Sequence, residues 1–237
     1  MAGTRAGFHT TRWSLVQQAG AAESTAAQDA LNELCTAYWR PLYAEVRRRG
    51  FSPADAQDVT QEFFARLLRR QSFGRADRQR GRFRTFLLAA LDHVLMDHWR
   101  DERAQKRGDG AAVLPLDADE VEQWYQELPA NDADAAAAFD QRWALVLMER
   151  GLQALRQDYA AGGRGALFEA LKPYLAAEAG DEGYAQAAAD AGLSENSFRV
   201  AVHRFRKRFR DSVREQVEAT VADPAEAAEE MRHLFGV

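Results

Sequence analysis

Cationic side chains recur at helical spacing near the end of the sequence. Arg199, His203, Arg206, Arg210 and Arg214 follow one another at intervals of three or four residues, so a helix would carry them on one face. Guanidinium groups on such a face can pair with DNA phosphates and with guanine edges. The pattern predicts a nucleic-acid-binding surface, with a solvated basic face of an ordinary helical bundle as the alternative. Apolar residues occupy another face of the same segment: Phe198, Ala201 or Val202, Phe205, Phe209 and Val213.

A short turn precedes this segment. Residues 184–191 are rich in alanine and predict a short helix, Gly192 and Leu193 predict a tight turn, and Ser194 is a suitable N-cap for the long helix that follows. Two helices joined in this way form a helix-turn-helix, whose second helix enters the major groove of DNA. We therefore expect the cationic face to bind duplex DNA.

Acidic side chains share one face of another predicted helix. Ser52, Pro53 and Asp55 form a helix-start signal. After it, Asp55, Asp58 and Glu62 recur at intervals of three and four residues. This face has the right charge to contact a basic surface on a partner protein, and a solvated acidic face is the alternative. The opposite stripe is apolar and predicts a buried side: Ala56, Val59, Phe63 and Leu67.

An enzymatic interpretation would depend on four residues of one predicted helix, Asp92, His93, Asp97 and His98, as a hydrolytic metal site. The sequence has no His-Glu-x-x-His pattern and no phosphate-binding glycine loop, and Cys35 is its single cysteine. We therefore expect a protein that is not an enzyme, with no metal and no cofactor.

Helical periodicity extends over most of the sequence, and no segment predicts a strand. A first helix is expected over about 27–49 and ends at Gly50. The next runs from residue 53 to about residue 70, the arginine-rich segment 71–82 predicts an exposed loop, and a third helix runs from Phe83 past Trp99. Its expected buried face consists of Phe83, Phe86, Leu87, Ala90, Leu91, Val94 and Leu95.

Charge is segregated along the 237 residues, although the net charge is only −5. Residues 66–107 hold 12 Lys or Arg against 5 Asp or Glu, and residues 199–214 hold 7 against 1. Between them, residues 109–140 hold 9 acidic residues and no basic one. Two anion-binding surfaces separated by an acidic spacer are therefore expected. No segment is apolar enough to insert into a membrane, and we expect a cytoplasmic protein.

The expected fold is all-α, with two small helical domains joined by an acidic linker. The first domain covers residues 27–107, the linker 108–138, and the second domain 139–217, which contains the helix-turn-helix. Extensions lie on either side, at 1–26 and 218–237. Trp124 and Tyr125 are unusual in a free spacer, so part of the linker is expected to dock on its own domains or on a partner.

The segment 55–67, with the sequence DAQDVTQEFFARL, resembles the polymerase-docking helix of extracytoplasmic-function sigma factors, in the sigma-70 family of bacterial RNA polymerase. The segments 83–87 (FRTFL) and 97–100 (DHWR) resemble the helix that melts and reads the minus-ten promoter element. The C-terminal helix-turn-helix is similar to the minus-thirty-five reader. The resemblance follows the family order from about residue 27 to residue 217.

This resemblance implies a sigma factor that binds core RNA polymerase and directs promoter recognition, strand opening and transcription initiation. The implied polymerase-binding residues are Asp55, Asp58, Gln61, Glu62 and Phe64. The implied minus-ten DNA-binding residues are Arg82, Arg84, Asp92, His93, Met96, Arg100 and Arg103. The implied minus-thirty-five DNA-binding residues are Ser194, Ser197, Arg199, His203, Arg206, Lys207 and Arg210.

Core RNA polymerase and promoter DNA are the expected partners, and an anti-sigma factor or another regulator is left open as a third. The residues after 217 exceed the minimal family plan, so the extension either regulates or packs. Asn196, Ser197 and Phe198 replace the small residues common early in the recognition helix, which leaves minus-thirty-five specificity open. The alternative function is a helix-turn-helix transcriptional regulator that acts without incorporation into polymerase.

Overall fold

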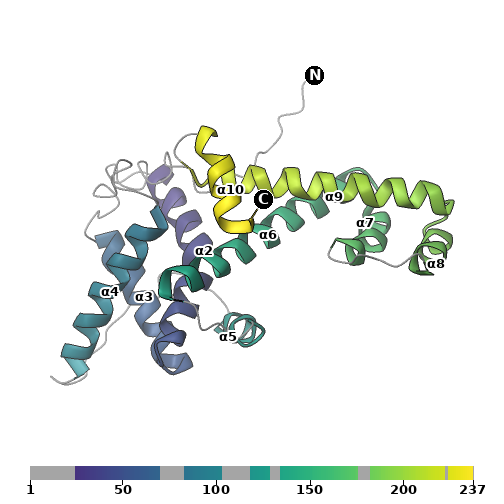
Figure 1. Ribbon diagram of the computed structural model, residues 1–237. Helices are drawn as coiled ribbons and strands as arrows, with labels where there is room; N and C mark the ends of the chain where they lie inside the picture. The colour runs from purple at the N-terminus through teal and green to yellow at the C-terminus, as the bar shows by residue number, and fades with distance from the viewer. Residues whose placement is uncertain are drawn as a thin grey trace. The chain divides into compact units, whose positions relative to one another are not determined.

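The computed structural model describes residues 25–69, 83–102, 118–128, 134–175, 182–221 and 224–236. These residues form helices, and no strand occurs among them, so the expected all-α fold is confirmed (Figure 1). The elements are α2 (Thr25–Arg48), α3 (Pro53–Arg69), α4 (Phe83–Glu102), α5 (Ala118–Gln126), α6 (Ala135–Ala161), α7 (Gly165–Leu171), η3 (Lys172–Tyr174), α8 (Glu182–Asp190), α9 (Glu195–Glu218), η4 (Pro224–Glu226) and α10 (Ala227–Phe235).

The chain forms two compact units whose boundary lies within α6. One unit combines the residues up to Val146 with those from Ala219 onward, and the other is Leu147–Glu218. These units differ from the domains expected from the sequence, which placed 139–146 in the second domain and 218–237 in a separate extension. The reason is packing, because Phe139 and Trp143 at the start of α6 are fully buried in the first unit.

The core of the first unit lies between α2, α3, α4 and the start of α6. Aromatic rings join these helices: Tyr38 of α2 stacks on Trp143 of α6 at 4.4 Å between centroids, and Trp39 stacks on Phe64 of α3 at 5.6 Å. Cys35 is also buried, and burial raises the pKa of its thiol to about 12. Most residues expected on buried stripes are buried: Tyr38, Leu42, Tyr43, Val46, Ala56, Val59, Phe63, Leu67, Leu87, Leu91, Val94 and Leu95.

Local signals set the ends of these helices as the sequence predicts. Gly50 separates α2 from α3 with a φ of 93°, a backbone conformation that favours glycine. The Asp55 amide then donates to Ser52 Oγ at 3.2 Å, and Ser52 Oγ donates to Asp55 Oδ2 at 2.6 Å. Ser52 is therefore the N-cap of α3.

Glu45 is a buried carboxylate that links two helices of the first unit through ion pairs. Its carboxylate is 0% exposed, and it accepts hydrogen bonds from Arg48 and Arg49 of the same helix at 2.9 Å. Arg142 of α6 reaches the same carboxylate at 3.3 Å. A buried carboxylate is strongly unfavourable without such partners, so these ion pairs fix the start of α6 on α2.

The linker helix α5 packs on α2 through opposite charges and aromatic rings. Glu122 accepts from Arg47 Nη2 at 2.9 Å and from Arg47 Nε at 3.0 Å, and it also accepts from the Tyr43 hydroxyl. The Arg47 guanidinium lies 5.1 Å from the centroid of the Tyr125 ring. Part of the expected linker is therefore docked on the chain itself.

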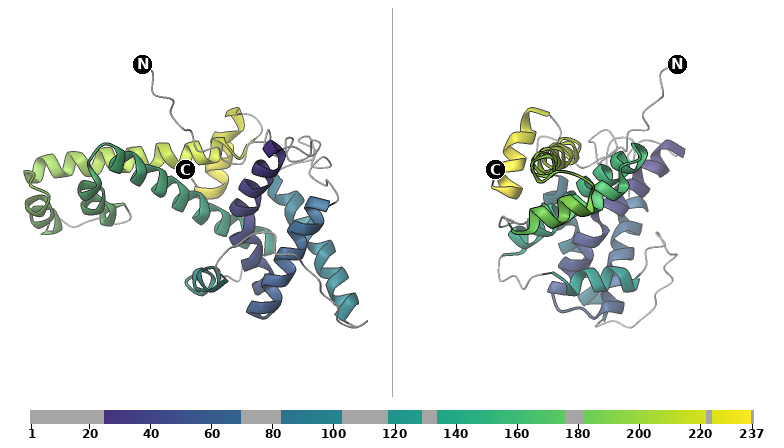
Figure 2. Two further views of the ribbon diagram at one scale, coloured as in Figure 1. Left: turned by 180° about the vertical axis from the view of Figure 1, so that it is seen from behind. Right: turned by 90° about the vertical axis from the view of Figure 1, so that its right-hand side faces the viewer.

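The second unit contains the later part of α6 together with α7, α8 and α9. Figures 1 and 2 show α7 and α8 on the same side of α9. The core is largely aromatic, and Tyr159, Phe168 and Phe205 contact one another edge to face at centroid distances of 5.5–6.0 Å. The apolar stripe expected on α9 is largely confirmed, since Phe198, Val202, Phe205 and Val213 are buried.

We predict opposite effects of alanine at two glycines of the second unit. A Cβ at Gly151 would lie 2.8 Å from Val213 Cγ2 and 3.1 Å from its amide nitrogen, so Gly151→Ala forces α6 and α9 apart. We expect a loss of about 1–3 kcal/mol in the free energy of unfolding. A Cβ at Gly165 would meet nothing within 4 Å, so Gly165→Ala is expected to gain about 0.5 kcal/mol. Urea unfolding measures both, and equal effects would contradict the close packing.

A second prediction concerns pH. The hydrogen bond from Arg47 lowers the pKa of Glu122 below its ordinary value of 4.5, despite burial, which alone would raise it. The stabilisation of the folded chain by this hydrogen bond is therefore complete at pH values above the pKa of Glu122 in the unfolded chain. It is lost as the pH falls through the lower pKa of Glu122 in the folded chain. Glu122→Gln is expected to cost about 1 kcal/mol at pH 7 in urea unfolding, and the cost should shrink below about pH 4. Glu127→Gln, at an exposed position of the same segment, is the control, and a cost independent of pH would refute the assignment.

Candidate functional site

The second unit exposes a cationic surface on α9. The α8–α9 turn is closed by Gly192, whose φ is 68°. Ser194 caps α9, because the Ser197 amide donates to Ser194 Oγ at 3.2 Å. The exposed basic side chains of α9 are His203, Arg204, Lys207, Arg208, Arg210 and Arg214. The structure thus places Ser194, Ser197, His203, Lys207 and Arg210 of the expected minus-thirty-five set at the surface.

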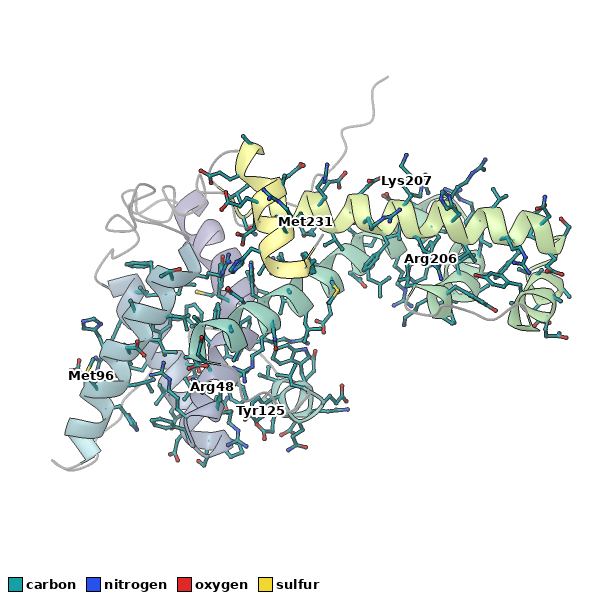
Figure 3. The ribbon with its side chains drawn as sticks, viewed as in Figure 1. Arg48, Met96, Tyr125, Arg206, Lys207 and Met231 are labelled. Atoms are coloured by element: carbon teal, nitrogen blue, oxygen red, sulfur yellow. The ribbon has the colours of Figure 1, made fainter. Side chains whose placement is uncertain are left out.

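Two arginines of that set are held within the unit. Arg206 is half-buried, and its Nε donates to the carbonyl oxygen of Tyr174 at 2.8 Å. Figure 3 shows Arg206 on the side of α9 that faces α7, and Lys207 on the opposite side. Arg199 pairs with Glu195 at 2.8 Å and lies 4.8 Å from the centroid of the Tyr184 ring. These contacts make Arg206 and Arg199 partly structural, and their role in DNA binding stays a prediction.

Sequence reasoning missed two exposed residues of the same helix, Val200 and Arg204. Val200 is 42% exposed although it is apolar, and Arg204 is exposed. Both follow Ser197 at helical intervals and precede Lys207 by seven and three residues. Helical spacing counted from Ser197 would have found both residues. Helical spacing counted from Arg199 instead leads to Arg206, which lies at the side of the exposed surface.

Of the residues expected to bind the minus-ten element, some are exposed on α4, one is paired with α2, and others lie outside the described residues. Met96 is 45% exposed (Figure 3). His93 is also exposed, and its ring Nδ1 lies 2.7 Å from the Ala89 carbonyl oxygen. Asp92 forms an ion pair with Arg49 of α2 at 2.6 Å. Arg82, Arg103 and the side chain of Arg100 lie outside the described residues.

The expectation for Arg84 requires a correction. Its side chain is not at the surface: the residue is 6% exposed, its Nε lies 2.5 Å from Asp140 Oδ1 of α6, and its Nη1 donates to Glu230 of α10. Burial alone would lower the pKa of the guanidinium, but the charges of Glu230 and Asp140 outweigh burial and raise it. Arg84 is thus a buried cation between two carboxylates, because α6 and α10 cover the start of α4.

The acidic face of α3 is present, with Asp55 and Asp58 exposed and Gln61 and Glu62 half-buried. Glu62 accepts from Arg66 at 2.7 Å, and Arg66 also reaches Asp97 of α4 at 2.8 Å. Phe64 requires a correction: it is 1% exposed and stacks on Trp39, so it has no surface to offer a partner.

The alternative metal site finds no support in these contacts, because Asp92 and Asp97 are paired with arginines of α2 and α3. Among the residues that the structure describes, no three His, Cys, Asp or Glu side chains converge as metal ligands. Within the same residues, no helix has both the length and the apolar character needed to cross a membrane.

Comparison with known protein families gives a match to part of the chain. Residues 34–105 match the family model of Sigma-70 region 2. No curated protein and no solved structure matches the chain. The matched segment contains the acidic face of α3 and the exposed residues of α4.

Proposed function

We propose that this chain is a sigma factor of the extracytoplasmic-function type, which binds core RNA polymerase and directs it to promoters. The observation that carries the proposal is the match of residues 34–105 to Sigma-70 region 2. A separate unit with an exposed cationic helix, α9, supports the presence of a second DNA-binding surface. Both surfaces are needed to recognise two promoter elements.

The polymerase contact is assigned to the acidic face of α3. Asp55 and Asp58 are exposed, and no ion pair to a cation is found for them among the described residues. Two exposed carboxylates one turn apart attract a basic surface and orient it. Gln61 and Glu62 complete this face, although Glu62 is already paired with Arg66.

Strand opening is assigned to α4 and to the arginine-rich segment before it. Met96 offers apolar surface and His93 offers a ring and a hydrogen-bonding nitrogen, which suit an unpaired base. Arginines of the flanking segments would follow the sugar-phosphate backbone. These groups act on single-stranded DNA, so tight binding is expected only after the polymerase has positioned the promoter.

Duplex recognition is assigned to α9. Arg204, Lys207 and Arg210 are exposed and suited to phosphates or guanine edges. Val200 lies among them and suits contact with a thymine methyl group. An independent regulator with a helix-turn-helix is the second candidate function, and it is favoured by this unit when taken alone.

Transcription with purified components separates the two functions. The full chain is mixed with core RNA polymerase and genomic fragments, and transcript starts are mapped with and without the chain. A sigma factor gives specific starts from core polymerase only when it is added, whereas a regulator gives none from core polymerase and binds duplex operators by itself. Absence of association with core polymerase at low salt refutes the proposed function.

Reversal of charge at Asp58 tests the docking face. We expect Asp58→Arg to weaken binding to core polymerase about tenfold or more, because it places a cation against a basic surface. Asp58 is exposed, so the thermal midpoint of the free chain should change little. Glu127→Arg makes the same charge change at an exposed site near the end of α5 and serves as the control. Equal binding by both variants would remove α3 from the interface.

Neighbouring residues on α9 give a matched pair for the DNA surface. We expect Lys207→Ala to weaken binding of the polymerase complex to promoter duplex and to lower the salt slope by about 1, because one phosphate contact is lost. Arg206→Ala removes the hydrogen bond to Tyr174, so we expect a loss of about 1.5 kcal/mol in the free energy of unfolding. Filter binding at several salt concentrations and urea unfolding provide the two readouts. An unchanged salt slope for Lys207→Ala would contradict the assignment.

A further inference from the structure

Two exposed arginines of the second unit lie beside one buried ring. The guanidinium carbon of Arg164 lies 5.0 Å from the centroid of the Tyr159 ring, and that of Arg208 lies 5.6 Å from the same centroid. Arg164 belongs to the turn between α6 and α7, whereas Arg208 belongs to α9. The ring is 4% exposed, because Phe168 and Phe205 pack against it edge to face. Two cations from separate elements are therefore brought to one place.

The backbone of the α6–α7 turn fixes the position of Arg164. The Gly163 amide donates to the Ala160 carbonyl oxygen at 3.0 Å, and the Arg164 amide donates to the Tyr159 carbonyl oxygen at 2.8 Å. These two bonds form a Schellman motif, which ends α6 with Gly163 at a φ of 69°. The Arg164 side chain folds back across the turn, since a Cβ added at Gly162 would lie 3.3 Å from its Nε. Arg164 is thus held at a defined place although it is exposed.

Neither guanidinium is neutralised by a carboxylate in the part of the chain that the structure describes. Other arginines of the second unit do have such partners: Arg156 pairs with Glu169 at 3.4 Å, and Arg199 pairs with Glu195 at 2.8 Å. An aromatic ring attracts each cation through its quadrupole but brings no net charge to balance it. Two like charges held beside one ring repel each other, and a bound anion relieves that repulsion. The pair is therefore suited to bind an anion.

Arg208 extends the cationic surface of α9 toward the α6–α7 turn. It follows Arg204 by four residues, so the two exposed side chains lie on one face of the helix. A guanidinium presents its donors in a fixed plane that matches the oxygens of a phosphate group. One DNA strand carries a phosphate about every 3.4 Å along the helix axis, so a strand that passes α9 can meet Arg208 and Arg164 in succession. Continuity with this surface favours a DNA phosphate over a free phosphate ion.

We propose that Arg164 and Arg208 form a second contact with duplex DNA, in which they bind backbone phosphates beside the groove that α9 enters. Because Arg164 lies outside α9, the contact fixes the orientation of this helix on the duplex and reads no sequence itself. This inference rests on the proposed function only in that α9 binds duplex DNA. It does not require assembly with polymerase.

The salt dependence of duplex binding tests the pair in the full chain without polymerase. Anisotropy of a fluorescent duplex is measured at several salt concentrations, beginning at low salt. We expect Arg164→Ala and Arg208→Ala each to weaken binding about fivefold and to lower the salt slope by about 1, equally for duplexes of different sequence. Arg164→Lys retains the charge and should keep most of the slope, which separates the charge from packing on Tyr159. Arg232→Ala removes one exposed cation from the first unit and is the control.

Lys207→Ala is the reference for the α9 surface. If it lowers the salt slope and both alanine variants of the pair leave the slope unchanged, α9 binds DNA and the proposed phosphate contact is overturned. The contact is also overturned if Arg232→Ala has an equal effect, if the wild type does not bind duplex at low salt, or if calorimetry shows that the pair binds inorganic phosphate while neither substitution changes duplex affinity. Circular dichroism checks that each variant is folded. Transcript starts from core polymerase are mapped separately, so failure of the pair remains distinct from failure of the sigma-factor assignment.

Discussion

The first unit is organised around a carboxylate that has no access to water. Glu45 lies in the middle of the bundle, and its charge requires the cations of Arg48, Arg49 and Arg142. Since Arg142 belongs to α6, this requirement brings a segment about 100 residues away onto α2. Once the start of α6 is fixed, Asp140 lies against the beginning of α4, and α10 completes the cluster around Arg84. The position of the C-terminal helix thus depends indirectly on one glutamate in the first described helix.

Arginines in this protein have two distinct uses. Among the described residues of the first unit, Arg47, Arg66 and Arg84 are engaged with carboxylates. Those of α9 include several at the surface, among them Arg204 and Arg210. The charge sum over residues 66–107 therefore includes two arginines, Arg66 and Arg84, that are paired with carboxylates. In α9, most of the basic residues counted over residues 199–214 are exposed at the surface.

Local features of the fold were predictable from the sequence because local forces determine them. The N-cap at Ser52, the turn at Gly192 and the buried stripe through Phe198 and Phe205 all follow from neighbouring residues and helical spacing. Long-range features were not predictable in this way. Phe64 follows Phe63 and is also buried, because Trp39 of a different helix covers it. Arg84 has a basic sequence neighbourhood, and only the folded chain reveals that Glu230 reaches it.

In the candidate site, too, local spacing predicts some features and long-range packing determines the others. The acidic face of α3 was found from spacing, since Asp55 and Asp58 are exposed where a helix places them. On α9, spacing alone did not distinguish the outward Lys207 from Arg206, whose guanidinium bonds to a backbone carbonyl of η3. Adjacent residues on a helix differ by about 100° in direction, so the position of the neighbouring element decides which of the two faces outward. That position is tertiary information.

The burial of the single cysteine gives the molecule a practical property. Cys35 is 1% exposed, and its thiol remains protonated at neutral pH. Since only the thiolate is an effective nucleophile, maleimide reagents should leave the folded native chain largely unmodified. A cysteine introduced on any surface helix would therefore be the preferred attachment point for a spectroscopic probe, with no need to remove the native residue first.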